Sequence, residues 1–381
     1  MTLPTSLWQT FALALDRARP GFTKGPWFTM NAVVELDDTL DADALATAFT
    51  ELQRRHEALR TEIVDEEQLI HQEATAQLEV VDEVTTHAEV PLHAPVRLRL
   101  AGNRLALHLH HMISDPVTLW ATLEDLAALY TNTGETPPPA QYADYSTAEA
   151  EQVRRTWEPA VAWWQERLVD AKPCPQPSST DGAAFAFRQD LLDADEVARV
   201  EQRTKEHRST TLVTLLEALV EGMNPHLGPG NSVVFSTLFS KRDRPAWQNV
   251  LGPCIVPSLL AVPRDAELPA MREAVIGCSR YARFPRSQLQ IDPRTPFFEY
   301  VPQQWPPGFT FGKTKASVIA AAGPKDTGLA DTLAIRMRTT TDGVLTGHFS
   351  GDGTDWTEPL VRQVLDRFRS HLLEGANKEW C

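Results

Sequence analysis

The chain has 381 residues, of which 42% are hydrophobic and 23% charged, the balance of an ordinary globular protein with one large domain or two lobes. Its formal charge of −15 at pH 7 argues against nucleic acid or an anionic membrane as the main partner. The four cysteines form no CxxC pair, and no apolar run approaches the roughly 20 residues that span a bilayer. We therefore expect no disulfide framework, no membrane segment and a cytoplasmic location.

The first half of the chain alternates between strand and helix patterns. Apolar residues recur with the period of a helix in some stretches and with the period of a strand in others. The predicted elements are a strand over 30–36, a helix over 40–60, strands over 96–100 and 105–111, a helix over 116–130, and, after a Pro-rich break at 137–139, a tryptophan-bearing helix over 157–168. Such an alternation is typical of an α/β fold.

Residues 172–182 are rich in Pro, Ser and Gly, which oppose any regular element, so this stretch is the predicted linker. We place an N-terminal lobe at residues 1–175 and a C-terminal lobe at 183–381. The elements predicted for the second lobe are helices over 193–207, 210–224 and 357–373, a strand over 231–238, and a hairpin of 333–337 and 345–350. The predicted class is α/β in two lobes.

The most informative segment is His108-Leu-His-His-Met-Ile-Ser-Asp-Pro116, where a predicted strand leads into a helix. Alternate side chains of a strand face opposite sides, so His111 would point into the protein with Leu109 if the strand persists that far. His108 and His110 would then face the other side. Because imidazole accepts and returns a proton near neutral pH, His111 is the candidate general base or positioning group, and Asp115 would organise its surroundings.

The same residues also have a purely structural explanation. Aspartate followed by proline is a good helix cap followed by a good first helical residue, so Asp115 and Pro116 fit a helix start on backbone grounds alone. A buried histidine such as His111 is more often a hydrogen-bonded core residue than a catalyst. The histidines at 108, 110 and 111 cannot converge on one metal ion from a single strand, so we expect no metal site.

Six segments match the motifs of one protein family in order along the chain. They are Arg55-His-Glu-Ala-Leu-Arg-Thr61 (RHExLRT), His110-His-Met-Ile-Ser-Asp115 (HHxxxDG), Tyr142-Ala-Asp-Tyr145 (YxDY), the helix with Trp163-Trp164, Lys241-Arg-Asp-Arg-Pro245 (GRxxP) and Leu251-Gly-Pro-Cys-Ile-Val-Pro-Ser-Leu259 (VGxFVNTL). Together they resemble the condensation domain of nonribosomal peptide synthetases over nearly all of residues 5–375.

The resemblance implies a pseudo-dimer of two chloramphenicol-acetyltransferase-like lobes with a tunnel between them. It implies an acyltransferase, free-standing in this case, that joins an acyl or aminoacyl thioester to an amine or hydroxyl acceptor. The thioester would arrive on the phosphopantetheine arm of a carrier protein acting in trans, with no cofactor bound to the enzyme itself. The expected partners are thus a carrier protein and a small-molecule acceptor, and the expected state is a monomer.

Carried over position by position, the resemblance assigns a role to each motif residue. His111 corresponds to the central catalytic histidine and His110 to the first histidine, which is usually structural. Asp115 corresponds to the aspartate that pairs with an arginine, for which Arg242 is the candidate. Two positions that line the substrate tunnel in the family depart from its pattern, because Pro116 replaces the motif glycine and Pro257 an asparagine.

Three hypotheses follow from this comparison. The first is an active condensation enzyme that forms an amide or an ester. The second, suggested by the two prolines, is an inactive condensation-like module that binds a carrier-tethered peptide or recruits a partner enzyme. The third is a carrier-independent acyltransferase that uses acyl-CoA. The arginines at 280, 283 and 286 could bind a phosphate of either carrier or CoA, although arginines at this spacing usually form a solvated face.

Overall fold

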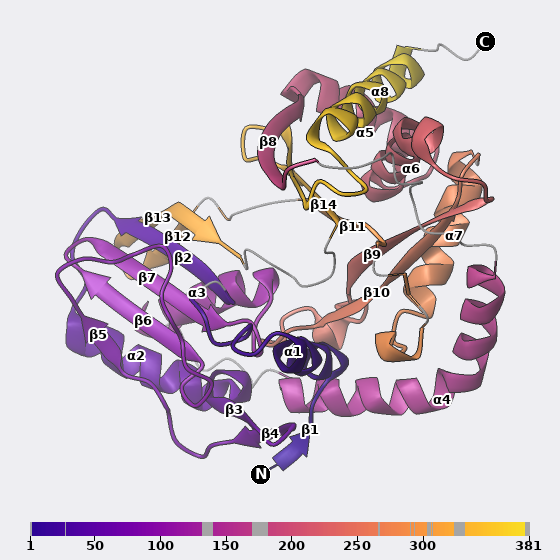
Figure 1. Cartoon of the computed structure of the whole chain (residues 1–381). Coiled ribbons are helices and arrows are strands. Elements are labelled where there is room, and N and C mark those ends of the chain that lie inside the picture. Colours follow the sequence, from indigo (N-terminus) through magenta and orange to yellow (C-terminus); the bar gives the residue numbers. More distant parts are fainter. Residues whose placement is uncertain are drawn as a thin grey trace. The chain divides into compact units, whose positions relative to one another are not determined.

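The computed structural model describes residues 2–26, 28–131, 140–169, 182–265, 267–289, 291–292, 294–302, 306, 308–323 and 332–377. These residues form a mixed α/β fold with two six-stranded sheets and one three-stranded sheet, which confirms the predicted class (Figure 1). The chain divides into two compact units that exchange segments: unit 1 holds residues 1–155, 240–256 and 305–327, and unit 2 holds 156–239, 257–304 and 328–381. The predicted linker lies, except for Gly182, outside the described residues. The tunnel and the division at 175/183 stay predictions.

Unit 1 contains a six-stranded sheet of strand order β12-β13-β2-β7-β6-β5 and a small sheet of order β1-β4-β3. Its strands are β1 (Thr2–Pro4), β2 (Thr29–Leu36), β3 (Thr61–Val64), β4 (Glu67–Ile70), β5 (Leu78–Val80), β6 (Val96–Ala101), β7 (Arg104–His110), β12 (Gly308–Phe311) and β13 (Thr314–Ala322). Its helices are α1 (Leu7–Ala18), α2 (Ala42–Arg55), the 3-10 helix η1 (Glu57–Arg60) and α3 (Pro116–Thr131). β7 pairs antiparallel with both β2 and β6, which makes it a central strand of the sheet.

Unit 2 contains the other six-stranded sheet, of strand order β10-β9-β11-β14-β15-β8. Its strands are β8 (Phe185–Leu192), β9 (Ser232–Ser240), β10 (Ile255–Pro263), β11 (Phe297–Val301), β14 (Leu333–Thr339) and β15 (Leu345–Gly351). Its helices are α5 (Ala194–Glu206), α6 (Thr211–Met223), α7 (Leu268–Arg280), α8 (Glu358–Asn377) and the short 3-10 helices η2 (Asn224–His226) and η4 (Arg286–Gln288). The 3-10 helix η3 (Pro245–Trp247) belongs to unit 1, and α4 (Tyr142–Leu168) contributes residues to both units.

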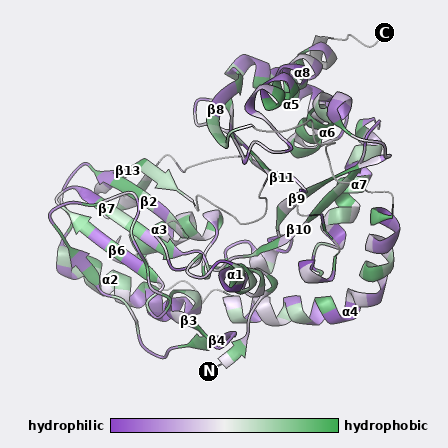
Figure 2. Cartoon of the chain, viewed as in Figure 1, coloured by the Kyte–Doolittle hydropathy of each residue, from purple (hydrophilic) through white to green (hydrophobic). Residues whose placement is uncertain are grey.

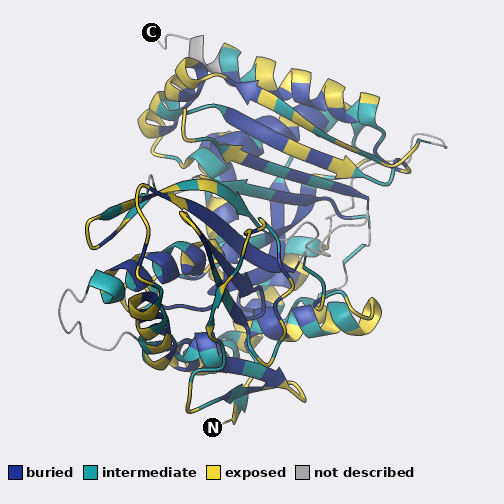
Figure 3. Ribbon diagram, turned by 90° about the vertical axis from the view of Figure 1, so that its left-hand side faces the viewer, coloured by how far each residue is buried: buried dark blue, intermediate teal, exposed yellow. Residues whose placement is uncertain are grey.

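Each unit has its own apolar core. In unit 1, Phe49 of α2 and Leu107 and Leu109 of β7 are fully buried in one cluster. In unit 2, Phe235 of β9 and Phe368 of α8 are fully buried in another. β9 and β10 carry stretches of hydrophobic residues (Figure 2), and largely buried strands lie beside helices on which buried and exposed residues alternate (Figure 3).

Most predicted elements are present, with different ends. The helix predicted over 40–60 stops at Arg55, because His56 adopts extended dihedrals and its N–H closes the helix on the Leu52 carbonyl. The predicted strand 105–111 ends at His110, and the helix predicted over 157–168 already begins at Tyr142. Over the described ranges, no helix has the length and hydropathy needed to cross a membrane.

Candidate functional site

His111 lies in the short loop that joins β7 to α3, one residue beyond the end of the strand. Its side chain is 4% exposed although the strand has ended. The ring packs against Trp8 of α1 and against Phe28, with ring centroids 4.5 and 5.2 Å away. Backbone contacts hold the loop as well, since the His111 N–H donates to the Phe28 carbonyl at 3.1 Å and Trp8 Nε1–H donates to the His111 carbonyl at 2.8 Å.

The orientation of the imidazole follows from one hydrogen bond. Nδ1 of His111 lies 2.7 Å from the Ser114 carbonyl oxygen, which can only accept, so Nδ1 carries the proton. A neutral imidazole then keeps its lone pair on Nε2. Burial lowers the pKa of His111 to about 4, against the smaller raising effects of the Ser114 carbonyl and Asp115. The ring is therefore neutral at pH 7 and presents an acceptor at Nε2.

His110 is bound on both ring nitrogens. Its Nε2 donates to the Thr23 carbonyl at 2.8 Å, and its Nδ1 accepts from the Met112 N–H at 3.1 Å. Burial lowers the pKa of His110 to about 4. With both nitrogens occupied, this side chain braces the loop and has no lone pair left for a substrate.

His108 is also buried, on the strand itself. Its Nδ1 donates to the Asn31 side-chain oxygen at 2.8 Å, an oxygen that must accept because the Asn31 amide nitrogen donates to the Thr29 carbonyl. Burial first, and then the nearby Arg99, lowers the pKa of His108 to about 3. The segment thus contains three buried neutral histidines, of which His108 and His110 serve the fold.

These three histidines make a stability prediction. Each has a pKa of about 3 or 4 in the folded chain and about 6.5 when unfolded, so above pH 6.5 none of them affects the free energy of unfolding. Below pH 6.5 the unfolded chain binds protons that the folded chain does not, so stability falls from pH 6.5 toward pH 4. We expect a slope of about 1.4 kcal/mol per pH unit for each histidine, or about 4 for all three near pH 5.

Urea unfolding at pH 7.5, 6.5, 5.5 and 5 measures this slope. The variant His108→Gln should take up about one proton fewer on unfolding near pH 5, so the slope of its unfolding free energy against pH should be smaller by about 1.4 kcal/mol per pH unit. An unfolding free energy that stays constant from pH 7.5 to pH 5 would contradict the prediction.

Asp115 caps helix α3 and also receives an ion pair. Its Oδ1 accepts from the Thr118 N–H at 2.8 Å, as an N-cap does, and its Oδ2 accepts from the Cys254 N–H at 3.1 Å. Arg242 Nη2 lies 2.9 Å from Oδ1 and 3.0 Å from Oδ2, and both side chains are under a tenth exposed. Asp115 therefore both caps α3 and pairs with Arg242, whereas its contribution to catalysis stays a prediction.

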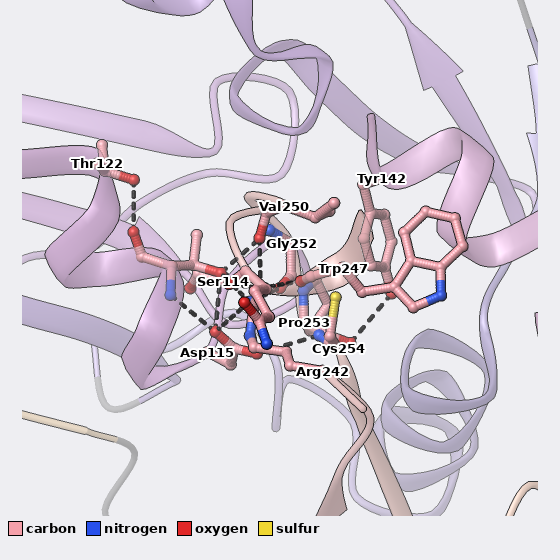
Figure 4. A network of polar contacts seen from close by, with 12 residues as sticks. Ser114, Asp115, Thr122, Tyr142, Arg242, Trp247, Val250, Gly252, Pro253 and Cys254 are labelled. Carbon is pink, nitrogen blue, oxygen red and sulfur yellow. Dashed lines mark hydrogen bonds and ion pairs between the residues drawn. The ribbon is translucent and has the colours of Figure 1, made fainter. Parts of the chain in front are cut away.

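Arg242 uses its other donors on the loop that follows it in the chain. Nη1 donates to the carbonyls of Trp247 at 3.0 Å and Val250 at 2.6 Å, and Nη2 lies 3.0 Å from the Gly252 carbonyl (Figure 4). Burial alone would lower its pKa, but the Asp115 carboxylate beside it raises the pKa of Arg242 above its ordinary value. One guanidinium thus ties the loop 247–252 to the start of α3.

The backbone at Gly252 completes this junction. Gly252 has φ +145°, and a Cβ there would lie 2.1 Å from the Tyr142 ring, so only glycine fits. Thr118 Oγ1 lies 3.0 Å from the Gly252 nitrogen and 2.8 Å from its carbonyl oxygen. Tyr142 in turn donates to Ser6 Oγ at 2.8 Å. The YxDY-like segment therefore packs directly on the loop that Arg242 holds.

Sequence reasoning missed the N-terminal helix as part of this site. Trp8 and Gln9 of α1 both donate to the histidine loop, Gln9 Nε2 reaching the Met112 carbonyl at 3.0 Å. The Leu7 N–H donates to buried Glu149 at 2.8 Å. The pair Ser6 and Gln9 forms a capping box that would have signalled the helix start, but nothing local indicates that its partner lies more than a hundred residues away.

The two prolines sit where the backbone tolerates them. Pro116 is the first residue of α3, where its missing N–H costs nothing to the helix, and it is exposed. Pro257 is buried in β10, which is the edge strand of its sheet, where a missing donor is least costly. Their expected place in a substrate tunnel stays a prediction.

The arginine cluster is not the solvated face that its spacing suggests. Arg280 is exposed, but Arg283 is buried at 6% and Arg286 is only partly exposed. The side chains of Cys254 and Cys278 are buried, and the cysteines at 174 and 381 lie outside the described residues.

Comparison with known proteins agrees with these observations. Residues 93–268 match the family model described as the condensation domain. A probable non-canonical nonribosomal peptide synthetase, CymA of Salinispora arenicola, is 28% identical over 60% of this chain, and the match covers 4% of that protein. The chain thus spans a small part of the length of the curated relatives that it matches.

Two solved structures share the fold. The condensation domain of the Monacolin K polyketide synthase MokA has a TM-score of 0.80 at 16% identity, covering 99% of this chain and 98% of that one. The X-domain from teicoplanin biosynthesis, solved in complex with OxyB, has a TM-score of 0.72 at 19% identity and covers 98% and 93%. At these identities the likeness is one of fold.

Proposed function

The chain belongs to the condensation-domain family, and from this membership we propose that it catalyses condensation of a carrier-bound acyl or aminoacyl thioester with an amine or hydroxyl acceptor. The observation that carries the proposal is the difference between the two motif histidines. His110 spends both ring nitrogens on backbone partners, whereas His111 is fixed through Nδ1 alone and keeps Nε2 as an acceptor. We place this activity in the cytoplasm, in keeping with two buried cysteines that form no disulfide in the described part of the chain.

The proposed step needs little from the enzyme beyond position and one proton transfer. The acceptor nitrogen attacks the thioester carbonyl carbon, the new C–N bond forms, and the C–S bond breaks as the tetrahedral intermediate collapses. Nε2 of His111 accepts a hydrogen bond from the attacking N–H and takes its proton. With a pKa of about 4, the imidazolium releases that proton readily to the departing thiolate, which leaves as the free thiol.

Asp115 and Arg242 support this step without touching the reacting atoms. The Ser114 carbonyl that orients His111 belongs to the residue just before Asp115, and Asp115 is held by Arg242 and by the Cys254 N–H. We therefore propose that both are positioning residues. Their ion pair would fix the position of the Ser114 carbonyl, and with it the orientation of the His111 ring and of its Nε2.

A non-catalytic module is the second candidate. The X-domain that shares this fold was solved in complex with OxyB, and Pro116 here removes a backbone N–H next to the histidine loop. If that N–H stabilises a developing oxyanion in active relatives, its absence favours binding over catalysis. A carrier-independent acyltransferase is the third candidate. Among the described residues, no contact favours acyl-CoA over a carrier-bound thioester.

Product analysis by mass spectrometry tests the three candidates. Thioesters on a carrier protein, on CoA and on free pantetheine would each be offered with a panel of amines and alcohols. We expect product from the carrier-bound thioesters. Product from CoA thioesters at the same rate would favour the carrier-independent enzyme, and retention of the carrier without any product would favour the binding module.

Restoring the glycine is expected to raise the rate. The change Pro116→Gly returns a backbone N–H at the first position of α3, and one oxyanion donor is worth about 10²–10³ in rate where it is well placed. We expect a gain of about tenfold in the rate of product formation, at a cost in stability of about 0.4–1 kcal/mol because the unfolded chain gains freedom. Steady-state kinetics and urea unfolding measure the two effects.

Pro91→Gly is the matched control, since Pro91 is an exposed loop proline outside the histidine loop. It should change the rate little. A rate for Pro116→Gly that is equal to or below that of the wild type would show that no catalytic donor is missing at this position.

A further inference from the structure

Arg286 is a partly buried cation whose contacts include no carboxylate within the described part of the chain. It lies in η4, and its Nη2 donates to Ser236 Oγ at 2.8 Å, while Nη1 lies 3.4 Å from the Ser258 carbonyl. Ser236 is fully buried and Ser258 is 2% exposed. A guanidinium has five N–H donors, so these two neutral contacts leave most of its hydrogen-bonding capacity unused.

The contrast with Arg242 shows how unusual this is. Both arginines are largely buried, but Arg242 has Asp115 at 2.9 Å, and the pKa of Arg242 is raised. For Arg286 burial is the cause at work, and it lowers the pKa to about 10. A buried charge without a counter-charge costs stability, and such a cost persists where the charge serves a ligand.

Arg286 is nevertheless partly exposed, so a ligand can reach it. The strands that carry its two partners also lead into the segment 240–256. Ser236 of β9 precedes Arg242 by six residues, and Ser258 of β10 follows Cys254, whose N–H donates to Asp115, by four.

We propose that Arg286 and Ser236 form a binding site for an oxyanion, a carboxylate or a phosphate group carried by a substrate of the condensation reaction. This assignment of substrate class rests on the proposed function. The planar guanidinium matches both groups, because it can donate two parallel hydrogen bonds to two oxygens of one anion. The hydroxyl of Ser236 orients the guanidinium from the buried side and leaves the other donors for the ligand.

The first test measures anion binding and stability without any catalysis. Thermal unfolding of the wild type is compared with that of Arg286→Gln, at constant ionic strength, in chloride, in inorganic phosphate and in succinate. We expect phosphate or succinate to raise the Tm of the wild type by a few degrees and to leave the variant unchanged. In chloride alone the variant should be as stable as the wild type or more so, because a partly buried charge without a carboxylate partner has been removed.

Arg264→Gln is the matched control. Arg264 also belongs to unit 2 and donates to backbone carbonyls, those of Asn224 and Gly230 at 3.1 Å, so its replacement should lower the Tm in every buffer but preserve the response to the anion. If Arg286→Gln behaves like Arg264→Gln, losing stability in chloride and still responding to the anion, Arg286 is structural and the proposal fails.

The second test identifies which substrate carries the anion. Pantetheine thioesters are compared with 4′-phosphopantetheine thioesters, and amino acid acceptors with their amides. We expect kcat/KM of Arg286→Gln to fall by about tenfold to a hundredfold only for substrates that carry the recognised anion, as loss of a charged hydrogen bond predicts. A uniform kcat/KM ratio over all four substrates in an active enzyme overturns the site and leaves the proposed function intact. If the wild type responds to the anion but forms no product, the anion site stands and the proposed function fails.

Discussion

Replacing His111 by alanine is expected to lower the rate of product formation by a hundredfold or more while the protein still binds its carrier. The variant loses the acceptor at Nε2, which in the proposed step orients the acceptor nitrogen and takes its proton, and general acid–base groups typically contribute about 10²–10⁴ in rate. The ring is also a packing partner of Trp8 and Phe28, so the variant creates a cavity. His111→Gln, which keeps a polar side chain of similar size, should therefore be more stable than His111→Ala and form product as slowly.

The measurement is single-turnover product formation, together with circular dichroism and a carrier pull-down for each variant. His93→Ala is the matched control, because His93 is exposed and lies outside the histidine loop. It should react at the rate of the wild type. If the His111→Ala protein is folded and reacts at the same rate as the wild type, His111 is not the catalytic base. The non-catalytic module would then be the better explanation for this loop's hydrogen bonds.

The pH dependence of the wild-type rate adds an independent check on the same residue. Burial lowers the pKa of His111 to about 4, so the imidazole is already neutral at pH 5.5. Between pH 5.5 and pH 8 the rate should follow the ionisation of the acceptor amine alone, and with a hydroxyl acceptor it should be nearly flat. An inflection near pH 6.5 with a hydroxyl acceptor would mean that His111 titrates as an exposed histidine does.

Replacing Arg242 by methionine is expected to lower the free energy of unfolding by about 3–5 kcal/mol, the range for breaking a buried ion pair from one side. Asp115 would remain 2% exposed with no counter-charge, and its N-cap and Cys254 hydrogen bonds would not offset the loss. The carbonyls of Trp247 and Val250 would lose a donor in addition. Arg242→Lys keeps the positive charge but not the fork of hydrogen bonds, so its free energy of unfolding should lie between those of the wild type and of Arg242→Met.

Arg294→Met is the matched control for this experiment. Arg294 forms an ion pair of the same 2.9 Å length with Asp292, but its side chain is 42% exposed. Removal of an exposed pair should cost less than about 1 kcal/mol. Urea unfolding of the three variants at pH 7.5 measures the difference. Equal losses for Arg242→Met and Arg294→Met would show that the buried pair contributes no more than the surface one.

Local features were readable from the sequence because their causes are local. The helix start at Asp193 is fixed by a capping box with Glu196, and the turn at Asp342-Gly343 by the positive φ of Gly343. The same holds for β7 and for α3, whose apolar residues recur at the spacing of a strand and of a helix. The motif segments identified the family for a related reason, since each is a short run of residues with its own backbone requirements.

The partners of the site residues depend on contacts that no local pattern encodes. Asp115 and Arg242 are separated by 127 positions in the chain, and Trp8 and the His111 carbonyl by 103. The family motif suggested the first pairing, but nothing in the sequence near Trp8 indicates that it packs on the histidine loop. The structure likewise places Arg286 partly out of solvent and against Ser236, whereas the spacing of neighbouring arginines suggested a solvated face.

The sequence by itself therefore predicted many of the elements, the resemblance to condensation domains and the candidate histidine, because periodicity, caps and motifs act over a few residues. Only the tertiary structure decided which nitrogen of each histidine is occupied, and why His110 braces the loop while His111 keeps an acceptor. It also decided which buried arginine has a carboxylate partner. These properties depend on desolvation and on hydrogen-bond partners distant in the chain, and folding alone brings both about.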